Sequence, residues 1–411
     1  MYNIIIADLT HTGIGINADV FPFGIGLIAA YAKQELGDMV DISLHKFPEQ
    51  LNEELKKNIP HVLAMSTYAW NSNLTYAFAA HVKKINPGTV IVFGGPDFPL
   101  PQDERRDYLL DKPAIDFIIK WDGEYSFTNL IKGLIDNNFN VERFKKDRII
   151  SNNLCYINAD YEYIEGPNER VQDLMTIPSP YMTGLLDKFF DTPLVPVIET
   201  TRGCPYSCTF CNDGSILRNK VFRKNTDFVR DELEFIAARV KNTNQMFMVD
   251  LNFGMYKHDI ETAKIIRSMI DRHHWPERIE STMGKSHPER LLEVTSIVNE
   301  GSKGVIKLGA SLQSIDRDVL QEIKRKNLSV EELLLLKEGH STRGNTTEQF
   351  FTELIIPLPG LTIEKHFGDL RNVVDRLEMN NIDVHQLTML KGSEMASRTE
   401  RHRLKLDVKH R

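Results

Sequence analysis

Short apolar runs alternate with amphipathic stretches through the first 150 residues. Stretches 24–36, 74–85 and 124–135 have the length and periodicity of helices. Five apolar or β-branched runs are predicted to be strands: 3–9, 40–44, 61–66, 89–93 and 115–119. Strands separated by helices predict a parallel, doubly wound sheet of flavodoxin-like type over residues 1–150. Ligands of such sheets bind beyond the carboxyl ends of the strands. We therefore expect the loops after Leu9, Ser66, Phe93 and Ile119 to line one site.

Residues 151–192 interrupt this pattern with scattered polar residues and prolines, and they are predicted to be a linker. A second alternating series follows over residues 193–395. Its predicted strands are 195–200, 245–251, 278–283, 304–312, 351–357 and 384–390. Six strand–helix units with parallel crossovers predict a partial (β/α)6 barrel with its chemistry at the carboxyl edge. The remaining residues, 396–411, form a charged tail that we expect to be solvated.

Composition places the chain among globular proteins. It has 411 residues, enough for two or three domains, with 41% hydrophobic and 26% charged residues. The net charge of −7 argues against a generally basic surface that binds nucleic acid. No apolar run approaches the ~18 residues that span a bilayer. The amino terminus lacks a basic region and a long enough apolar region for a secretory signal. We expect a cytoplasmic protein that binds neither membranes nor nucleic acid.

The cysteines are concentrated in one short stretch. Three of the four in the chain, Cys204, Cys208 and Cys211, fall within eight residues, and Cys155 stands alone in a polar stretch. A disulfide scaffold would spread its cysteines along a shorter chain, so this clustering indicates metal or redox chemistry. We interpret Cys155 as a bystander.

Three thiolates suit an iron–sulfur cube that has one iron without a protein ligand. A purely electron-transferring [4Fe–4S] cube usually takes four cysteines, so a three-cysteine site leaves one iron open to another ligand. Zinc is the alternative. Structural zinc sites take four ligands, and neither a second cysteine pair nor a histidine at finger spacing follows Cys211. The spacing therefore favours a cluster.

The motif Cys204-x3-Cys208-x2-Cys211, with Phe210 before the third cysteine, resembles the signature of radical S-adenosylmethionine (SAM) enzymes. The core of that family is a partial (β/α)6 barrel, which agrees with the strand count above. The resemblance implies that the three cysteines hold a [4Fe–4S] cluster and that SAM chelates the fourth iron. One electron from the cluster then cleaves SAM to methionine and a 5′-deoxyadenosyl radical.

Further family-like features follow along the predicted barrel. Val249-Asp-Leu-Asn-Phe-Gly254 ends the second strand, where the family binds the methionyl end of SAM, and either of its polar residues is a candidate contact. Leu308-Gly-Ala-Ser-Leu-Gln-Ser314 resembles the strand that reaches the ribose, and 353–360 the strand and turn beside the adenine. The alternative for these polar residues is a hydrogen-bonded barrel interior. The implied SAM contacts are Phe210, Asp250, Asn252, Ser311, Gln313 and Glu353.

The order of a doubly wound domain and such a barrel resembles the cobalamin (B12)-binding radical SAM class. The stretches that carry this resemblance are 21–26, 66–71, 94–96, 122–124 and 177–184. Small residues would let the backbone approach the corrin, and hydroxyl groups would meet its nucleotide tail. The implied cobalamin contacts are His11, Phe23, Gly24, Ser66, Thr67, Tyr68, Gly94, Gly95, Pro96, Gly123 and Glu124.

Two departures from the class bear on this assignment. Classical cobalamin domains carry Asp-x-His-x-x-Gly, whereas this chain reads Asp8-Leu-Thr-His11-Thr-Gly13, with one residue too many between Asp and His. His11 is therefore either a cobalt ligand or an ordinary loop histidine. Members of the class also commonly carry a further C-terminal domain. Its absence from this sequence is compatible with a truncated chain, a minimal enzyme or a substrate that completes its own site.

The resemblance implies a cobalamin-dependent methyltransferase that acts on an unactivated carbon or a phosphorus centre. One SAM would methylate cobalamin, and a second would yield the radical that removes a substrate hydrogen. The implied partners are a small-molecule or peptide substrate and an electron donor of flavodoxin or ferredoxin type. The alternatives are a cyclisation, rearrangement or oxidation on the same cluster, and a non-catalytic sensor that binds cobalamin and a cluster. Methylthiolation needs a second cluster on the N-terminal domain, and residues 1–154 contain no cysteine.

Overall fold

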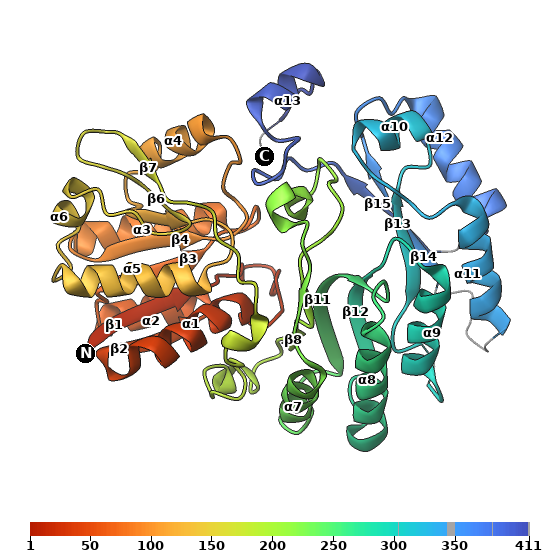
Figure 1. Ribbon diagram of the computed structural model, residues 1–411, viewed down its shortest axis with the longest axis horizontal. Helices are drawn as coiled ribbons and strands as arrows, with labels where there is room; N and C mark the ends of the chain where they lie inside the picture. The colour runs from red at the N-terminus through yellow and green to blue at the C-terminus, as the bar shows by residue number, and fades with distance from the viewer. Residues whose placement is uncertain (303, 343–349, 380, 410–411) are drawn as a thin grey trace. The chain divides into compact units, whose positions relative to one another are not determined.

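The computed structural model describes residues 1–302, 304–342, 350–379 and 381–409. The chain forms two compact units, each of α/β type (Figure 1). Unit 1 comprises Met1–Leu194 with Leu390–Gly392, and unit 2 comprises Val195–Met389 with Ser393–Arg411.

Unit 1 is built on a seven-stranded sheet in the order β2-β1-β3-β4-β5-β6-β7. Its five parallel strands are β1 (Tyr2–Ala7), β2 (Val40–His45), β3 (Val62–Ser66), β4 (Val90–Gly94) and β5 (Phe117–Ile119). Apolar residues of these strands, such as Ile5, Leu63 and Ile91, are fully buried, as expected for a parallel sheet that is covered on both faces. The predicted doubly wound sheet is confirmed.

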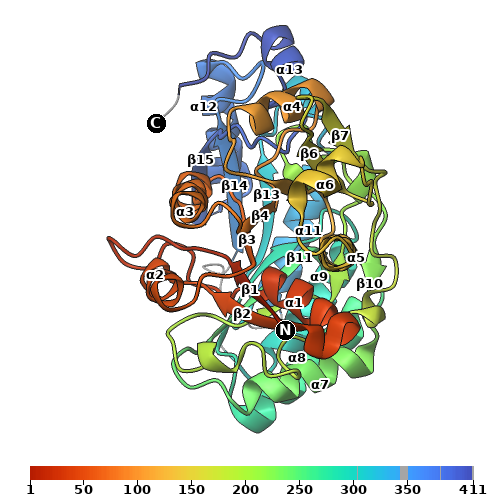
Figure 2. The ribbon, with the colours of Figure 1, turned by 90° about the vertical axis from the view of Figure 1, so that its left-hand side faces the viewer.

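Helices cover both faces of this sheet (Figure 2). One face is covered by α1 (Phe23–Leu36) and α5 (Glu124–Asp136), and the short α6 (Val141–Lys146) follows α5. On the other face, α2 (Pro48–Lys57), α3 (Ser72–Ile85) and α4 (Gln102–Leu110) share one hydrophobic core with the strands. The sequence patterns predicted α1, α3 and α5 but not α2 or α4, which are short and mostly charged.

The segment predicted to be a linker contributes to the sheet of unit 1. β6 (Leu154–Ile157) pairs antiparallel with β5, and β7 (Tyr163–Glu165) pairs antiparallel with β6. Glu165 accepts hydrogen bonds from Arg105 and Lys120, which fasten the new edge to the rest of the unit. The antiparallel extension escaped prediction because its strands are only four and three residues long and lie among polar turns.

Unit 2 contains the six predicted barrel strands. β8 (Val197–Ile198), β11 (Gln245–Phe253) and β12 (Arg278–Met283) form one parallel sheet, and β13 (Leu308–Gln313), β14 (Phe350–Ile356) and β15 (Asn381–Gln386) form another. A parallel bridge between Ile279 and Ile306 joins the two sheets. The resulting order, β8-β11-β12-β13-β14-β15, is that of a partial (β/α)6 barrel, as predicted.

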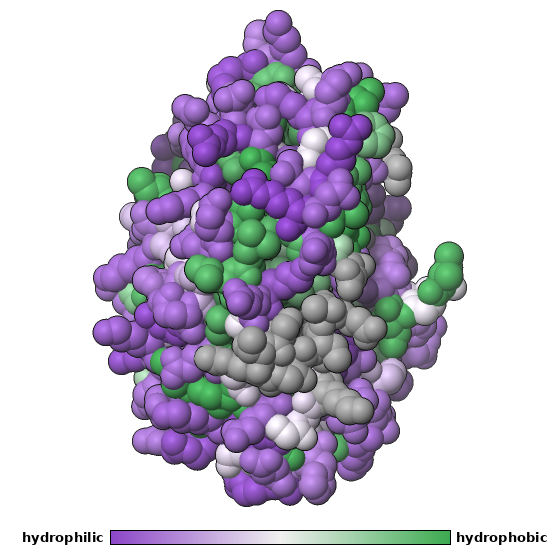
Figure 3. Space-filling model, turned by 90° about the vertical axis from the view of Figure 1, so that its right-hand side faces the viewer, coloured by the Kyte–Doolittle hydropathy of each residue, from purple (hydrophilic) through white to green (hydrophobic). Residues whose placement is uncertain are grey.

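Helices follow the barrel strands and lie outside them (Figure 1). They are α7 (Thr226–Ala237), α8 (Asp259–His273), α9 (Pro288–Asn299), α10 (Arg317–Glu322), α11 (Val330–Thr342) and α12 (Ile363–Arg371). The short α13 (Arg398–Arg403) belongs to the C-terminal tail. Figure 3 shows apolar residues among polar ones on the face that carries the later barrel helices, where Leu335, Ile363 and Phe367 are more than half exposed.

Part of the charged tail packs on unit 2, in contrast to the prediction of a solvated end. Ser397 caps α13, and Arg403 forms ion pairs with Glu322 and Glu400. Leu404 and Leu406 pack against a small core of Val319, Ile323, Leu358 and Met395. These apolar residues lie among charged ones, which hid the contact at the level of the sequence. Residues 410 and 411 lie outside the described residues.

Candidate active site

The cysteine loop follows the first barrel strand of unit 2. It lies between two short paired strands, β9 (Thr201–Arg202) and β10 (Phe222–Arg223). Gly203 has φ +118°, and a Cβ atom there would lie 2.3 Å from the Lys220 carbonyl oxygen. The Cys204 amide donates to the Arg218 carbonyl at 2.9 Å, and the Cys211 amide donates to the Cys208 carbonyl at 3.1 Å. Backbone contacts therefore fix the loop before any cofactor binds.

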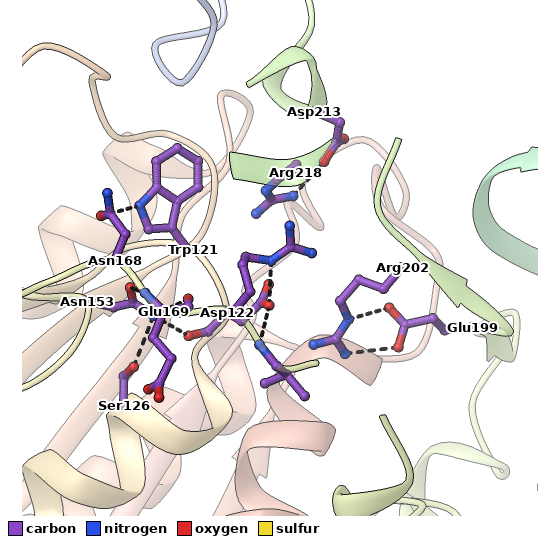
Figure 4. Close-up of polar contacts among 12 residues, drawn as sticks. Trp121, Asp122, Ser126, Asn153, Asn168, Glu169, Glu199, Arg202, Asp213 and Arg218 are labelled. Carbon is purple, nitrogen blue, oxygen red and sulfur yellow. Dashed lines mark hydrogen bonds and ion pairs between the residues drawn. The ribbon is translucent and has the colours of Figure 1, made fainter. Parts of the chain in front are cut away.

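Two ion pairs support the approaches to this loop. Arg202 donates two hydrogen bonds to the Glu199 carboxylate, at 2.8 and 2.9 Å, and Arg218 pairs with Asp213 at 2.5 Å (Figure 4). Each ion pair joins two residues that are close in the sequence, so it stiffens the chain locally. The charges of these side chains are therefore used within the loop.

The three thiols are shielded from solvent. Cys204 and Cys208 are buried, Cys211 is half-buried, and all are free. Burial, reinforced by the charge of Asp213, raises the pKa of Cys211 to about 11. The free thiol is thus protonated at neutral pH, and binding a cofactor as thiolate releases its proton.

The donor set distinguishes a cube from a single metal ion. In the described parts of the chain, no group of three or more His, Cys, Asp or Glu residues is close enough to hold one metal ion. A tetrahedral zinc ion would need its ligands around one point. A [4Fe–4S] cube binds each thiolate through a different iron, so its ligands stand farther apart. The residues present supply the three cysteine donors that such a cube takes, all on one loop.

The carboxyl end of β11 supplies polar atoms beside the loop. Asn252 is buried, and its Nδ2 donates to Cys204 Sγ at 3.3 Å, while its Oδ1 has no hydrogen-bond partner. The hydroxyl of Tyr256, four residues later, is also buried without a partner. Burial raises the pKa of Tyr256, and the nearby Cys204 adds to this effect. Buried polar atoms without partners are rare in native proteins, and they point to a bound group.

Asp250, two residues before Asn252, has a different environment. Its fully buried carboxylate accepts a hydrogen bond from the Thr200 amide at 2.7 Å and others from the hydroxyls of Thr200 and Thr201. Burial raises its pKa to about 6, although these hydrogen bonds act in the opposite direction. Asp250 thus ties β11 to the segment that leads into the cysteine loop. Its predicted contact with SAM stays a prediction.

The later strands add polar groups of two kinds. Gln313, at the end of β13, is buried and its Oε1 has no partner, whereas Ser311 is half-buried. Glu353 on β14 lies 3.7 Å from His385. Phe210 of the cysteine loop packs against the small core that includes Ile323 and Met395. The roles predicted for these four residues in SAM binding stay predictions.

Sequence reasoning missed two residues beside the loop. Nη1 of Arg325 lies 3.9 Å from Cys208 Sγ, and its Nη2 is buried without a partner. Arg325 stands in the run Lys324-Arg-Lys326, which has the appearance of a solvated charged turn. Tyr256 follows a glycine and a methionine, with no surrounding pattern to mark it. The position of Tyr256 three residues beyond a barrel strand was the available signal for that residue, and Arg325, which follows α10, had none.

In unit 1, polar groups at the carboxyl ends of β1, β3 and β4 bond to one another. The Ser66 hydroxyl donates to Asp8 at 2.7 Å, and Asp8 pairs with the buried Lys46 at 2.9 Å. Both the amide and the hydroxyl of Thr67 donate to the Gly94 carbonyl, at 2.7 and 2.8 Å. The predicted residues Ser66, Thr67 and Gly94 are thus brought together.

Gly95 lets two loops of unit 1 approach closely. Its φ is +102°, and a Cβ atom there would lie 2.5 Å from the Thr67 carbonyl oxygen. Gly94 is less constrained, because a Cβ atom would meet only the Ile119 carbonyl at 3.5 Å. Asp97, just beyond Pro96, is buried and pairs with Lys391 at 2.6 Å.

Aromatic residues surround the remaining predicted cobalamin contacts. Tyr68 stacks on Trp70 with ring centroids 4.5 Å apart, and His11 Nε2 lies 2.9 Å from the Trp70 carbonyl oxygen. Phe23 is buried and stacks on Tyr181, whereas a Cβ atom on the neighbouring Gly24 would have nothing within 4 Å. The arrangement of His11 is that of a loop histidine, and its predicted role on cobalt stays untested.

The loop after β5 is anchored by buried polar groups. Asp122 accepts hydrogen bonds from Arg170 Nε at 2.7 Å and from the Val171 amide at 2.9 Å, while Asn153 Nδ2 donates to the Asp122 carbonyl (Figure 4). Gly123 and Glu124 follow at the start of α5, where Glu124 is buried and a Cβ atom on Gly123 would lie 2.9 Å from Ile28. The four loops that we expected to line one site follow parallel strands, so they all begin at the same carboxyl edge of the sheet in unit 1.

Comparison with known proteins assigns a domain to each unit. Residues 12–131 match the B12 binding domain, and residues 198–365 match the Radical SAM superfamily. The chain is 30% identical to the 2-(S-pantetheinyl)-carbapenam-3-carboxylate methyltransferase of Streptantibioticus cattleyicolor, over 84% of this chain and 50% of that enzyme. It is 25% identical to the cobalamin-dependent radical SAM methyltransferase TokK of Streptomyces tokunonensis, over 93% of this chain and 55% of that enzyme.

A solved structure shares this fold. The radical SAM methyltransferase TsrM of Kitasatospora setae, with cobalamin and a [4Fe–4S] cluster bound, aligns with a TM-score of 0.69 and 13% identity, over 96% of this chain and 74% of that chain. The chain spans about half the length of the two curated relatives. No helix in the described parts of the chain is long and apolar enough to cross a membrane.

Proposed function

Because the chain belongs to the radical SAM enzymes that carry a B12-binding domain, we propose that it transfers a methyl group from SAM to an unactivated carbon, or a phosphorus, of a small molecule. Its cofactors are a [4Fe–4S] cluster and cobalamin, and SAM is its cosubstrate. When bound, the cluster supplies the electron that cleaves SAM, and cobalamin carries the methyl group. The protein's task is to hold these groups and to exclude water from them.

The observation that carries this proposal is the set of unpartnered polar atoms beside the cysteine loop. Three buried or half-buried thiols from one rigid loop would hold the cluster. Asn252 Oδ1 and Gln313 Oε1 are acceptors suited to the ammonium and hydroxyl groups of SAM, and both lie at the carboxyl ends of barrel strands. Asn252 Nδ2 keeps its side chain beside Cys204 while Oδ1 stays available.

In unit 1, the proposal assigns the corrin to the carboxyl edge of the sheet. Gly95 lets the loop after β4 lie directly against the Thr67 backbone, and Ser66 and Thr67 present hydroxyl groups that already lie in fixed positions. These residues would shape and position the cobalamin site. His11 would act through its loop, with its ring held at the Trp70 carbonyl.

Methyl transfer is favoured over the alternative reactions by the extent of the matches. The two relatives that align with 84% and 93% of this chain are both named methyltransferases. Cyclisation, rearrangement or oxidation on the same cluster is the second candidate, and a non-catalytic sensor is the third. The proposed partners are a small-molecule substrate and a flavodoxin- or ferredoxin-type electron donor, with the cytoplasm as the place of action.

The test uses the 411-residue chain, reconstituted without oxygen with cluster and cobalamin. SAM with an isotopic label on its methyl group is added with reductant, first alone and then with 2-(S-pantetheinyl)-carbapenam-3-carboxylate. We expect 5′-deoxyadenosine, and label recovered with cobalamin or with the added compound. Cys208→Ala should abolish both, and Cys155→Ala, the matched control in unit 1, should abolish neither.

The outcomes separate the candidates. Release of 5′-deoxyadenosine without any label on cobalamin or on the added compound would contradict methyl transfer and favour the second candidate. Cobalamin and cluster bound in full, with SAM left uncleaved, would favour the sensor.

A further inference from the structure

Arg325 is a buried cation without a carboxylate partner. Its side chain follows α10 and is 7% exposed. Among the residues that the structure describes, no carboxylate lies within ion-pair distance of its guanidinium, and Glu353 acts on it only at longer range. A buried charge that lacks a counter-charge is strongly destabilising. The position therefore requires an anion.

The guanidinium is held in one orientation. Its Nε donates to Asn327 Oδ1 at 2.9 Å. Asn327 Nδ2 donates in turn to the carbonyls of Leu312 and Ser314, at 2.8 and 3.0 Å, which fixes the amide to the end of β13. Asn327 thus engages Nε and leaves Nη1 and Nη2 for other partners.

One end of the fork meets the cysteine loop, and the other is buried without a partner. Nη1 lies 3.9 Å from Cys208 Sγ, and Nη2 is buried with no partner. Burial lowers the pKa of Arg325, and the sulfur atoms of Cys208 and Cys211 act in the opposite direction. The anionic groups closest to this cation are therefore the thiolates that hold the cluster.

We propose that Arg325 is a positioning residue that donates a hydrogen bond to the Cys208 thiolate and makes the bound cluster easier to reduce. In the reduction, the oxidised cluster takes up one electron from the external reductant, and no bond in the protein forms or breaks. The reduced cluster carries one more negative charge, and a fixed positive charge in a site shielded from water favours that state. This inference rests on the cluster of the proposed function but not on methyl transfer. The role of Arg325 can therefore be wrong while methyl transfer holds, and methyl transfer can be wrong while the role of Arg325 holds.

The experiment is a redox titration of the reconstituted protein without SAM, followed by electron paramagnetic resonance of the reduced cluster. At the wild-type midpoint potential, Arg325→Gln should lower the ratio of reduced to oxidised cluster about tenfold. For a one-electron couple this corresponds to a midpoint potential that is lower by about 59 mV. Arg325→Lys keeps the charge and should stay within about threefold of wild type. Lys326→Gln removes the same charge one residue away, from an exposed side chain, and should leave the midpoint unchanged because solvent screens it.

Three results would overturn the proposal. The first is an Arg325→Gln protein with full cluster content and a wild-type midpoint. The second is that same unchanged midpoint with weaker SAM binding, which would assign Arg325 to the cosubstrate alone. The third covers the case in which Arg325→Gln assembles no cluster. The proposal then requires that the Arg325→Lys protein assemble a cluster with a near wild-type midpoint. If that protein fails to do so, the shape of the guanidinium rather than its charge is required, and the proposal is wrong.

Discussion

The carboxyl edges of the two sheets differ in how their polar side chains are paired. In unit 1, Ser66, Asp8 and Lys46 form a closed chain of bonds, and Thr67 is bonded to Gly94. In unit 2, atoms of Asn252 and Arg325 beside the cysteine loop, and of Gln313 at the end of β13, are buried without partners. Both edges belong to parallel α/β folds, so the fold alone does not produce this difference.

The difference separates two ways of binding a cofactor. At the ends of β1, β3 and β4, unit 1 pairs its polar groups with one another, and only His45 Nδ1 at the end of β2 is buried without a partner among the described strand ends of this edge. This edge offers a shaped backbone on which a large, flat ligand can lie. Unit 2 keeps buried donors and acceptors unpaired, which is unfavourable until a charged ligand pairs with them. Unit 2 should therefore depend on its ligands for stability, and unit 1 should not.

Loading the cluster gives the largest expected effect on this comparison. We expect it to stabilise unit 2 by at least ~3 kcal/mol, the gain for a ligand at a hundredfold excess over its dissociation constant. Unit 1 should gain little. Amide hydrogen exchange with and without cluster checks this, with β8, β11 and β12 compared with β1, β3 and β4. Equal gains in both units would remove the distinction.

Replacing Gly95 by alanine tests the claim that backbone shape matters most in unit 1. The positive φ and the 2.5 Å approach to the Thr67 carbonyl both oppose a Cβ atom. We expect a loss of roughly 1–3 kcal/mol in urea unfolding, and weaker cobalamin binding. Gly94→Ala is the matched control, since its Cβ atom would make an ordinary contact. A Gly95→Ala protein as stable as Gly94→Ala would contradict the account.

The buried carboxyls of unit 2 and the buried His45 of unit 1 should make stability depend on pH in opposite directions. Burial also lowers the pKa of His258 in unit 2 to about 4, which offsets part of the effect of the carboxyls. Burial raises the pKa of Asp250 to about 6 and that of Asp259 to about 7. Their folded-state pKa values lie above the unfolded value, so the stability they contribute in protonated form is lost as pH rises through 6 to 7. In unit 1, burial lowers the pKa of His45 to about 4, so its contribution is lost as pH falls from about 6.5 through 4.

Urea unfolding of the cluster-free protein at pH 5 and pH 8 measures this effect. Unit 2 should lose on the order of 2 kcal/mol between the two values, and Asp259→Asn should remove part of that loss. A loss that is the same with and without the Asp259 carboxyl would show that its burial has no energetic consequence.

The smallest effect comes from removing one polar group from each edge. Ser66→Ala leaves Asp8 short of a donor and should destabilise unit 1 by about 1 kcal/mol. Gln313→Met removes an unpartnered oxygen, so the cluster-free protein should lose no stability, while SAM binding weakens. Thermal unfolding and SAM titration of the two variants provide the comparison. Equal destabilisation by both would contradict the difference between the edges.

The sequence predicted the alternating core better than it predicted the edges. All six barrel strands and the five parallel strands of unit 1 were recognised from the sequence. Strands such as β3 and β4 are continuous apolar runs, whereas β12 and β15 are more polar and were recognised as members of the alternating series. Helices such as α2, and the added strand β7, were missed because they are short and polar, and their positions depend on tertiary contacts.

Local signals gave mixed results at helix starts. Ser-x-x-Glu is the sequence pattern of a capping box, and Ser329 and Glu332 form its two reciprocal hydrogen bonds, of 2.7 and 3.1 Å. The similar pattern at Ser286 and Glu289 does not, because α9 begins at Pro288 after His287 in a left-handed conformation. A proline inside the pattern shifts the start of the helix.

Candidate site residues could be predicted only where the spacing itself carries chemistry. Cys204, Cys208 and Cys211 were identifiable because metal ligands on one loop must follow one another closely. Arg325 was not, because a charged residue in a basic run usually lies in solvent and only the fold buries it. Whether a polar residue has a partner, the property that distinguishes Asn252 from Asp250, is also decided by the fold.

The central claim is that three thiolates of unit 2 hold a cube whose fourth iron is open to SAM. The direct test is electron paramagnetic resonance of the reduced, reconstituted protein before and after SAM is added, together with its iron content. The account predicts about four irons per chain and a signal that changes with SAM in wild type and in Cys155→Ala. A signal that SAM leaves unchanged, or a cluster that survives replacement of all three loop cysteines by alanine, would contradict it.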